Sequence, residues 1–244
     1  MTSFSQRIDR AASDKKSRII LALDPPSAKP GLLDFAEKTI KAVEQHISAI
    51  KMNFHLILPL SAAEILQINK IAHSYGLQSI ADIKLNDIEN TNQVALYHLV
   101  RMGFDAVIAN PFIGSGGLMA LVQNAHKVDA GVIALVYMSH PGAGEGYGLE
   151  EKTGVPLYQT FLRRAVEAKA DGVVVGATRL EIIKQVAKHG IPVYSPGVGT
   201  QGGDLENAVR NGADYLIIGR SIVEAQNPAQ AAKEMQNRIL AVSK

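Results

Sequence analysis

Short runs of apolar, mostly β-branched residues recur along the chain, and segments of a different periodicity separate them. Each run has about the length of a typical β-strand. Because the runs are almost continuously apolar, they predict strands that are covered on both faces, as in a parallel sheet. The predicted strands span residues 18–24, 48–53, 78–84, 105–109, 131–137, 171–176, 191–195 and 214–219.

The segments between these runs carry apolar residues every three or four positions, which is the spacing of an amphipathic helix. The clearest helices are predicted at residues 32–46, 62–75, 91–102, 157–170 and 228–242. A strict alternation of strand and helix implies a parallel sheet with helical crossovers. Eight such units predict an α/β fold of the closed (β/α)8, or TIM barrel, type.

An open, doubly wound sheet is the main alternative to the barrel. That fold usually carries a glycine-rich turn after its first strand, whereas this chain has Asp24, Pro25 and Pro26 there. The length of 244 residues suits one barrel, which typically needs about 250. Since no linker or shift in composition marks a second domain, we predict a single catalytic domain over residues 1–244.

The composition is that of an ordinary globular domain, with 47% hydrophobic and 20% charged residues. A formal net charge of +2 without basic runs does not indicate nucleic acid or a membrane surface as a partner. The polar first segment lacks the apolar core of a signal peptide, and no apolar run approaches the roughly 20 residues that span a bilayer. The absence of cysteine excludes disulfides, thiolate nucleophiles and cysteine-ligated metals. We therefore expect a soluble, cytoplasmic protein.

Charged residues gather where the predicted strands end, which is the face that carries the active site in barrel enzymes. Asp24 ends the first strand, Lys51 lies at the end of the second, and Asp82 and Lys84 lie at the end of the third. Such groups are costly to bury unless they are paired, so their clustering indicates a site. Asp82 and Lys84 are two positions apart, and a regular strand would direct both side chains to the same face. A structural ion-pair network is the plainer explanation of this pair.

Asp87 lies at the predicted start of the next helix. An acidic residue there can serve as an N-cap or complement the helix dipole without any further function. Thr91 follows four positions later and would share a helical face with Asp87. The pair could therefore reach a ligand or a partner subunit.

The loops after the last two predicted strands have the composition of a phosphate site. Residues 195–204 are glycine-rich, and Gly219, Arg220 and Ser221 follow the eighth strand. Barrels often bind phosphate with these two loops through backbone N–H groups, which glycine lets approach closely. Arg220 can add a bidentate contact. A tight turn next to a surface arginine is the alternative.

Residues 139–154 follow the fifth predicted strand, contain several glycines and show no periodicity. Their position and length indicate a mobile active-site loop, with a disordered surface loop as the alternative. His140 lies in this loop and could line the site. The histidines show no metal-binding spacing such as HExxH, so the sequence predicts no metal site.

Taken in their order along the chain, these motifs resemble those of the orotidine 5′-phosphate decarboxylases, and the short chain resembles the archaeal form. The resemblance covers nearly the whole chain and rests on residues 21–24, 51, 81–91, 138–142, 195–204 and 219–221. It implies a barrel enzyme that converts orotidine 5′-phosphate to UMP and CO2 without a metal or an organic cofactor.

The resemblance also implies catalytic roles. Asp24 would hydrogen-bond the ribose, and Lys51 would bridge the ribose and the catalytic carboxylates. Asp82 would face the substrate carboxylate, and Lys84 would protonate the carbon that loses CO2. Asp87 would belong to the catalytic set of the neighbouring subunit.

Further residues would bind the substrate. Thr91 would reach into the neighbouring site together with Asp87, which implies a homodimer with shared sites. Ser139 would contact the pyrimidine, and the rest of the substrate site would be formed by Pro196, Gln201, Gly219 and Arg220. Of these, Gln201 and Arg220 would hold the phosphate, with a backbone contact from Gly219.

The charges suit this chemistry, because loss of CO2 leaves a carbanion that nearby positive charge stabilises. Lys84 lies between Asp82 and Asp87 in the sequence and is expected to stay protonated, so that it can donate a proton. Repulsion by Asp82 would raise the ground-state energy of the substrate carboxylate.

Two other functions are compatible with parts of the pattern. One is a magnesium-dependent barrel enzyme that shares the D-x-K-x-x-D motif, such as 3-keto-L-gulonate 6-phosphate decarboxylase or hexulose phosphate synthase. Lys51 and residues 138–142 argue against it. The other is a barrel that binds a phosphorylated ligand without catalysis. The complete set of Lys51, Asp82, Lys84 and Asp87 argues against that function.

Overall fold

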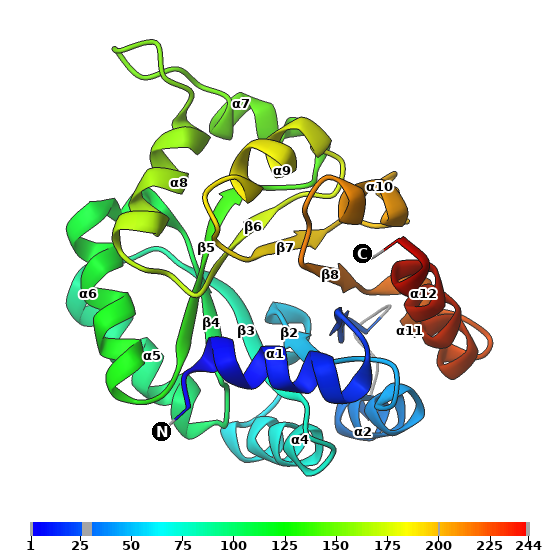
Figure 1. Ribbon diagram of the computed structural model, residues 1–244. Coiled ribbons are helices and arrows are strands. Elements are labelled where there is room, and N and C mark those ends of the chain that lie inside the picture. The colour runs from blue at the N-terminus through cyan, green and yellow to red at the C-terminus, as the bar shows by residue number, and fades with distance from the viewer. Residues whose placement is uncertain (1, 26–30, 200, 243–244) are drawn as a thin grey trace.

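The computed structural model describes residues 2–25, 31–199 and 201–242. Eight parallel strands form a closed barrel in chain order, and β8 pairs with β1 to complete the circle (Figure 1). The strands are β1 Ile19–Ala22, β2 Ala49–Met52, β3 Gln78–Leu85, β4 Ala106–Ala109, β5 Gly131–Tyr137, β6 Gly172–Val175, β7 Val193–Pro196 and β8 Tyr215–Ile218. The predicted (β/α)8 barrel is confirmed, and each predicted strand is present.

Helices surround the barrel (Figure 1). The five predicted helices are present as α2 Leu32–Val43, α4 Ala62–Ser74, α5 Glu89–Arg101, α8 Leu157–Glu167 and α12 Pro228–Val242. Three others are α6 Gly114–Lys127, α9 Leu180–Ala187 and α10 Leu205–Arg210, and the short ones are α3 Phe54–Ile57, η1 Pro111–Ile113, η2 Pro141–Ala143, α7 Gly144–Tyr147 and α11 Arg220–Val223. Within the described ranges, no helix combines the length and apolarity needed to cross a bilayer.

Aromatic rings fill the barrel near the beginnings of the strands. Tyr194 and Tyr215 are register partners on β7 and β8, and their rings stack with centroids 4.8 Å apart. Gly172 at the start of β6 makes room for this stack, because a Cβ there would come within 2.3 Å of the Tyr194 ring. A missing side chain on one strand thus accommodates a large one on the next.

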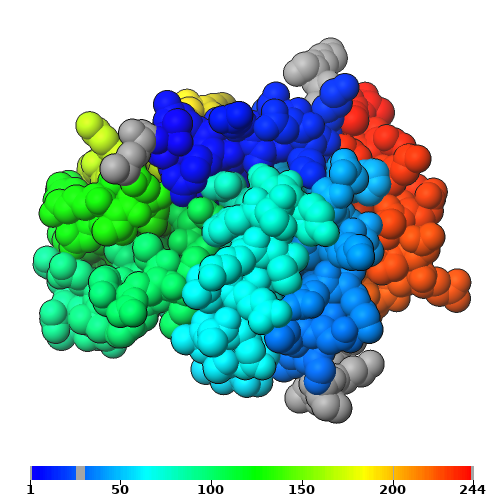
Figure 2. Space-filling model, turned by 90° about the horizontal axis from the view of Figure 1, so that it is seen from below, coloured from blue at the N-terminus to red at the C-terminus, as the bar shows by residue number. Residues whose placement is uncertain are grey.

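One further helix, α1 Phe4–Lys15, was not predicted from the sequence. It begins with a capping box, in which Ser3 and Gln6 exchange side chain to backbone hydrogen bonds. Its buried face includes Phe4 and Ile8, and the Phe4 ring occupies the space of the absent side chain at Gly131. In Figure 2, α1 is the dark blue band along one edge of the molecule, between the green segment and the red C-terminal helix.

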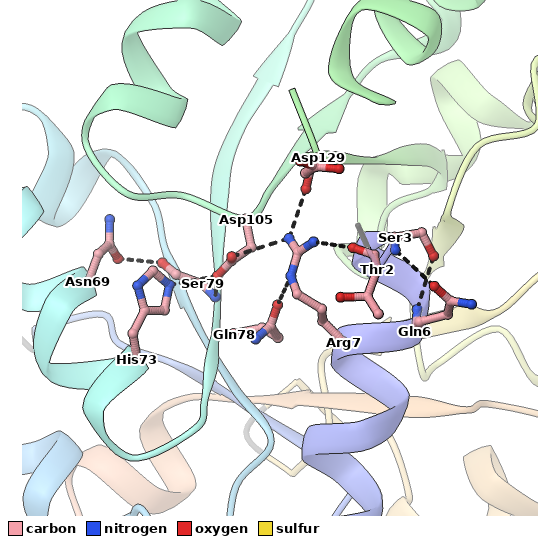
Figure 3. A network of polar contacts seen from close by, with 10 residues as sticks. All are labelled: Thr2, Ser3, Gln6, Arg7, Asn69, His73, Gln78, Ser79, Asp105 and Asp129. Carbon is pink, nitrogen blue, oxygen red and sulfur yellow. Dashed lines mark hydrogen bonds and ion pairs between the residues drawn. The ribbon is translucent and has the colours of Figure 1, made fainter. Parts of the chain in front are cut away.

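Arg7 ties α1 to the beginnings of three strands (Figure 3). Its guanidinium donates to Gln78 Oε1 at 3.0 Å and to the Asp129 carbonyl at 2.8 Å, and it forms an ion pair with Asp105 at 3.3 Å. Asp105 also accepts from the backbone N–H of Ser79 at 2.8 Å. The helix therefore closes the N-terminal end of the barrel, and the opposite end carries the loops that form the candidate site.

Candidate active site

A cavity of about 270 Å³ lies at the carboxyl ends of the strands, where barrel enzymes carry their chemistry. Most of the predicted site residues line it, namely Asp24, Lys51, Asp82, Lys84, Ser139, Pro196, Gln201, Gly219 and Arg220. They come from β2, β3 and β7, from the segments that follow β1, β5 and β7, and from the junction of β8 with α11. Residues that are distant in the sequence are thus brought together by the closure of the sheet.

Asp82 lies between two ammonium groups. Lys51 Nζ donates to Asp82 Oδ2 at 2.9 Å, and Lys84 Nζ donates to Asp82 Oδ1 at 2.7 Å. Lys51 is also 3.5 Å from Asp24 Oδ1, which is buried and makes no hydrogen bond within the described part of the chain. Each oxygen of the Asp82 carboxylate therefore accepts from an ammonium group, whereas the Asp24 carboxylate, whose side chain is 26% exposed and lines the cavity, can still accept a hydrogen bond from a ligand.

Mutual attraction keeps the Lys51–Asp82 pair ionised. Burial, the largest influence on Asp82, would raise the pKa of its carboxyl, but the charges of Lys51 and Lys84 and their hydrogen bonds lower that pKa below the ordinary value. Burial would likewise lower the pKa of Lys51, but Asp82 and Asp24 raise it above the ordinary value. Lys51 is only 4% exposed, so this charge would be costly without its two partners.

A bulge in β3 places Lys84. Ala81 pairs with Val107 and Leu85 pairs with Ala109, so three residues of β3 lie opposite one residue of β4. Lys84 has a φ of 48°, in the left-handed region that is rare for side chains other than glycine. Regular strand alternation is therefore the wrong reason for the predicted proximity of Asp82 and Lys84. Their side chains meet because the strand is distorted between them.

Other non-glycine residues with positive φ lie just after helices. They are Lys16, Asp129 and Lys169, which follow α1, α6 and α8. A left-handed residue commonly ends a helix. Within the described segments, Lys84 is the residue of this group that lies inside a strand.

The loops after β5 and β7 are joined across the cavity. Ser139 Oγ donates to Gln201 Oε1 at 2.6 Å. Gly197 makes this approach possible, because its φ is 92° and a Cβ there would lie 2.7 Å from that of Ser139. Binding a ligand between these loops would therefore be coupled to the Ser139–Gln201 hydrogen bond.

The segment after β5 contains more structure than its sequence suggests. Residues 139–154 include η2 and α7, and Tyr147 is buried with its ring 5.5 Å from that of Tyr137. His140 lines the cavity. The predicted absence of regular structure in this segment is wrong for its first half, because buried aromatic rings anchor two short helices.

The loops after β7 and β8 approach each other at Gly199, where a Cβ would come within 2.7 Å of Ser221 Oγ. Gln201 and Arg220 lie next to this contact in the sequence, and both line the cavity. Thr200 of the predicted phosphate loop lies outside the described residues. The Arg220 guanidinium, the Gln201 amide and the glycine-rich backbone of the loop after β7 together give this part of the cavity a lining that suits an anion.

Asp87 and Thr91 do not line the cavity, and both are exposed. Asp87 precedes α5 instead of capping it, because the N-cap is Ile88 and Asp87 Oδ1 accepts from the backbone N–H of Ile88 at 2.7 Å. The sequence placed Asp87 at the start of the helix, whereas in the structure it lies two residues before the first helical residue, Glu89.

Sequence reasoning did not identify the apolar wall of the cavity, which is formed by Ala22, Ile108, Leu135, Met138, Val174, Val198 and Ile217. A signal was present in the strands. Val174 and Ile217 lie two positions after Gly172 and Tyr215, so they face the same side of the sheet. Counting alternate positions back from the predicted strand ends would have found Val174 and Ile217.

Comparison with known proteins gives this arrangement a family. The sequence model of the orotidine 5′-phosphate decarboxylase / HUMPS family matches residues 17–235. The chain belongs to this family. Its relatives include the orotidine 5′-phosphate decarboxylase of Pyrococcus horikoshii, which is 37% identical over 227 residues, 92% of this chain and 100% of that protein. That of Methanosarcina barkeri is 35% identical over 93% of this chain and 96% of its own length.

Solved structures of the family have the same barrel. The orotidine 5′-monophosphate decarboxylase of Methanocaldococcus jannaschii, in complex with the inhibitor BMP, superimposes with a TM-score of 0.77 at 29% identity and covers 91% of this chain and 97% of its own. A Toxoplasma gondii structure reaches a TM-score of 0.87 over 98% of this chain and 96% of its own, at 22% identity, which shows a shared fold. The family match begins at Ser17 and thus leaves α1 outside it.

Proposed function

We propose that this protein converts orotidine 5′-phosphate to UMP and CO2, the last step of de novo pyrimidine nucleotide synthesis. The names of its relatives support this reaction. The observation that carries the proposal is the buried Asp82 carboxylate between the ammonium groups of Lys51 and Lys84 in the wall of the cavity. A cytoplasmic location, which a cysteine-free chain suits, is part of the proposal.

Lys84 and Asp82 divide the chemistry. The bond between C6 and the carboxylate breaks, CO2 leaves, and the electron pair stays on C6. The Lys84 ammonium stabilises this carbanion and transfers a proton to C6, after which the neutral amine regains a proton from water. Asp82 repels the substrate carboxylate in the ground state, and Lys51 keeps Asp82 ionised.

The other lining residues bind the rest of the substrate. The Asp24 carboxylate, which lines the cavity beside Lys51, accepts a hydrogen bond from a ribose hydroxyl. Ser139 contacts the pyrimidine, and the phosphate lies against Gln201, Arg220 and the Gly219 backbone, with Pro196 in the wall. Binding energy from the distant phosphate supports the transition state by holding the loops closed.

The proposal includes a homodimer in which Asp87 and Thr91 complete the neighbouring site. Apolar side chains of the same segment are open to solvent in the single chain, with Ile88 72%, Val94 49% and Tyr97 55% exposed. Exposed apolar and aromatic groups around polar residues are typical of a protein interface. A second copy of the chain would cover them.

The geometry of Asp82 argues against the magnesium-dependent chemistry that relatives within the wider family perform. A divalent cation would need carboxylate oxygens as ligands, and the ammonium groups of Lys51 and Lys84, 2.9 and 2.7 Å from the Asp82 oxygens, would repel a cation there. No cofactor or metal is therefore part of the proposed reaction.

The decisive assay uses purified protein that has been treated with a chelator. Incubation with orotidine 5′-phosphate should give UMP and a loss of orotate absorbance at the same rate with and without the chelator. If the absorbance stays constant, or if turnover begins only when Mg²⁺ is added, the proposed function is wrong.

Mixed dimers test the shared site. Lys84→Ala and Asp87→Ala chains are each expected to be almost inactive. Random exchange between them should restore about one quarter of the sites, because half of the twofold dimers then contain one intact site. If the mixture has only the summed activity of the two variants, each site is formed by one chain.

A further inference from the structure

We propose that Asn92 is the positioning residue that holds Asp87 in place for the reaction, an inference that rests on the proposed function. Asn92 lies in the first turns of α5 and is only 1% exposed. A buried amide is costly unless its donor and acceptor are both satisfied. Both are satisfied by the backbone of Asp87.

The two contacts clamp a single residue from both sides. Asn92 Nδ2 donates to the Asp87 carbonyl at 2.5 Å, and the Asp87 N–H donates to Asn92 Oδ1 at 3.2 Å. Rotation of the Asp87 backbone would break at least one of these bonds. Since Asp87 Oδ1 in turn accepts from the Ile88 N–H at 2.7 Å, the fixed backbone also orients the carboxylate.

The segment that carries Asp87 has few other restraints. Residues 86–88 are exposed and link the end of β3 to α5. On the strand side, the chain is held at Leu85, whose carbonyl accepts from the Asn110 N–H at 2.8 Å. Asn92 supplies the second anchor, so the turn between them has both of its ends fixed.

In the proposed dimer, Asp87 serves the site of the neighbouring subunit. Asn92 therefore acts across the interface, although its own contacts lie within one chain. A loose Asp87 would leave Lys84 of the partner with a less well-placed carboxylate, which lowers turnover more than substrate binding.

A double-mutant cycle tests the inference. Asn92→Ala should lower kcat/KM for orotidine 5′-phosphate by about 10- to 100-fold, mainly through kcat, because hydrogen bonds that position a charged group have this worth. In an Asp87→Ala background, the same substitution should change kcat/KM by less than about twofold, since coupled residues are not additive. An equal loss in both backgrounds, or no loss in the wild type, overturns the proposal.

Asn69→Ala is the matched control for a merely structural effect. Asn69 is also fully buried, on α4, and its amide donates to the Met102 carbonyl at 2.7 Å. This variant should lose stability as Asn92→Ala does, yet keep kcat/KM within about twofold of wild type at a temperature where both are folded. If Asn92→Ala does not fold, Asn92→Asp enters the same cycle, because it keeps the size and loses the donor to Asp87.

Mixed dimers separate this inference from the proposed function. Asn92→Ala and Lys84→Ala chains together form one site that has an intact Lys84 and a properly held Asp87. The mixture should therefore be more active than the sum of its parents, as the Lys84→Ala and Asp87→Ala pair is. Complementation by the Asp87 pair without complementation by the Asn92 pair rejects the role of Asn92 and leaves the shared site standing. A wild type that does not decarboxylate the substrate rejects the proposed function itself.

Discussion

Lys84 Nζ donates to Asp82 Oδ1 at 2.7 Å, and the Lys84 backbone that allows this contact is left-handed within β3. A left-handed residue other than glycine costs roughly 1–2 kcal/mol. Such strain persists at functional sites when the surrounding structure holds it in place. Here the regular pairing of β3 with β4 on either side of the bulge holds it.

Substitutions at Lys84 distinguish the catalytic role of its ammonium group from the strain of its backbone. We expect Lys84→Ala and Lys84→Gly to lower kcat by about 10⁴-fold or more, since proton transfer and charge stabilisation are both lost. Lys84→Gly should be at least as stable as Lys84→Ala, because glycine has no penalty at a φ of 48°. Kinetics and thermal unfolding measure the two effects. A glycine variant less stable than the alanine variant contradicts the claim of strain.

The bulge marks the limit of what the sequence could reveal about the site. Asp24, Lys51, Asp82 and Arg220 could be placed at one face because strand ends in a barrel share that face. The distortion at Lys84 could not be predicted, since local preference favours an extended strand and tertiary pairing overrides it.

The missed helix α1 has a different cause. Ser3 with Gln6 is a capping box, and Phe4, Ile8 and Ala12 recur at helical spacing, so the local signal was present. Its position at the barrel end depends on contacts of Phe4 with Gly131 and of Arg7 with Asp105, which are 127 and 98 residues apart in the sequence. Such long-range contacts leave no local pattern.

Removing Lys51 should make stability depend on pH in a new way. Lys51→Met leaves the buried Asp82 carboxylate with one partner, which should cost about 3–5 kcal/mol near neutral pH. In the wild type, the pKa of Asp82 is lowered, so the pair stabilises above the ordinary pKa and loses this contribution as pH falls through the lowered value. Without Lys51, burial should raise the pKa of Asp82, so that Asp82 becomes protonated as pH falls and its charge is no longer buried with too few partners. The difference in the free energy of unfolding between the variant and the wild type should therefore narrow as pH falls.

Denaturant unfolding between about pH 4 and pH 8 measures this gap. Lys38→Met is the control, because Lys38 is exposed and pairs with Asp34 on the surface, where an ion pair contributes at most about 1 kcal/mol. A Lys51→Met deficit that is the same at every pH shows that Asp82 does not titrate as described.

Ser139 and Gln201 should act as a unit. Each alanine substitution breaks the same 2.6 Å hydrogen bond between the loops and is expected to lower kcat/KM by about tenfold. The double variant should lose less than the product of the two single losses, because the second substitution finds the bond already broken. Strict multiplicativity would mean that the loops close independently.

Arg220 should matter only for a substrate that carries a phosphate. Arg220→Ala is expected to lower kcat/KM for orotidine 5′-phosphate by about 10- to 100-fold, the worth of a charge-assisted contact. The slow reaction of orotidine, which lacks the phosphate, should be unchanged. Arg210→Ala at the end of α10 is the control, since Arg210 lies outside the cavity. Equal losses with both substrates would show that Arg220 does not act through the phosphate.

Phe4 should contribute to stability and not to turnover. Phe4→Ala removes a ring that is 1% exposed and should cost about 3–5 kcal/mol, with kcat unchanged at a temperature where the variant is folded. Gly131→Ala should be destabilising in the wild type, where its Cβ meets the Phe4 ring, and tolerated in the Phe4→Ala background. Unfolding of the four proteins tests this, and additive losses would show that the two residues do not share space.

The packing of the Phe4 ring against Gly131 also sets an order of events during synthesis of the protein. Phe4 leaves the ribosome before any strand of the barrel, but the hollow that receives its ring exists only after β5 has been made. Helix α1 therefore emerges with the Phe4 ring uncovered and stays so until the chain has been translated through β5. During that interval its apolar face is open to chaperones and to other unfinished chains.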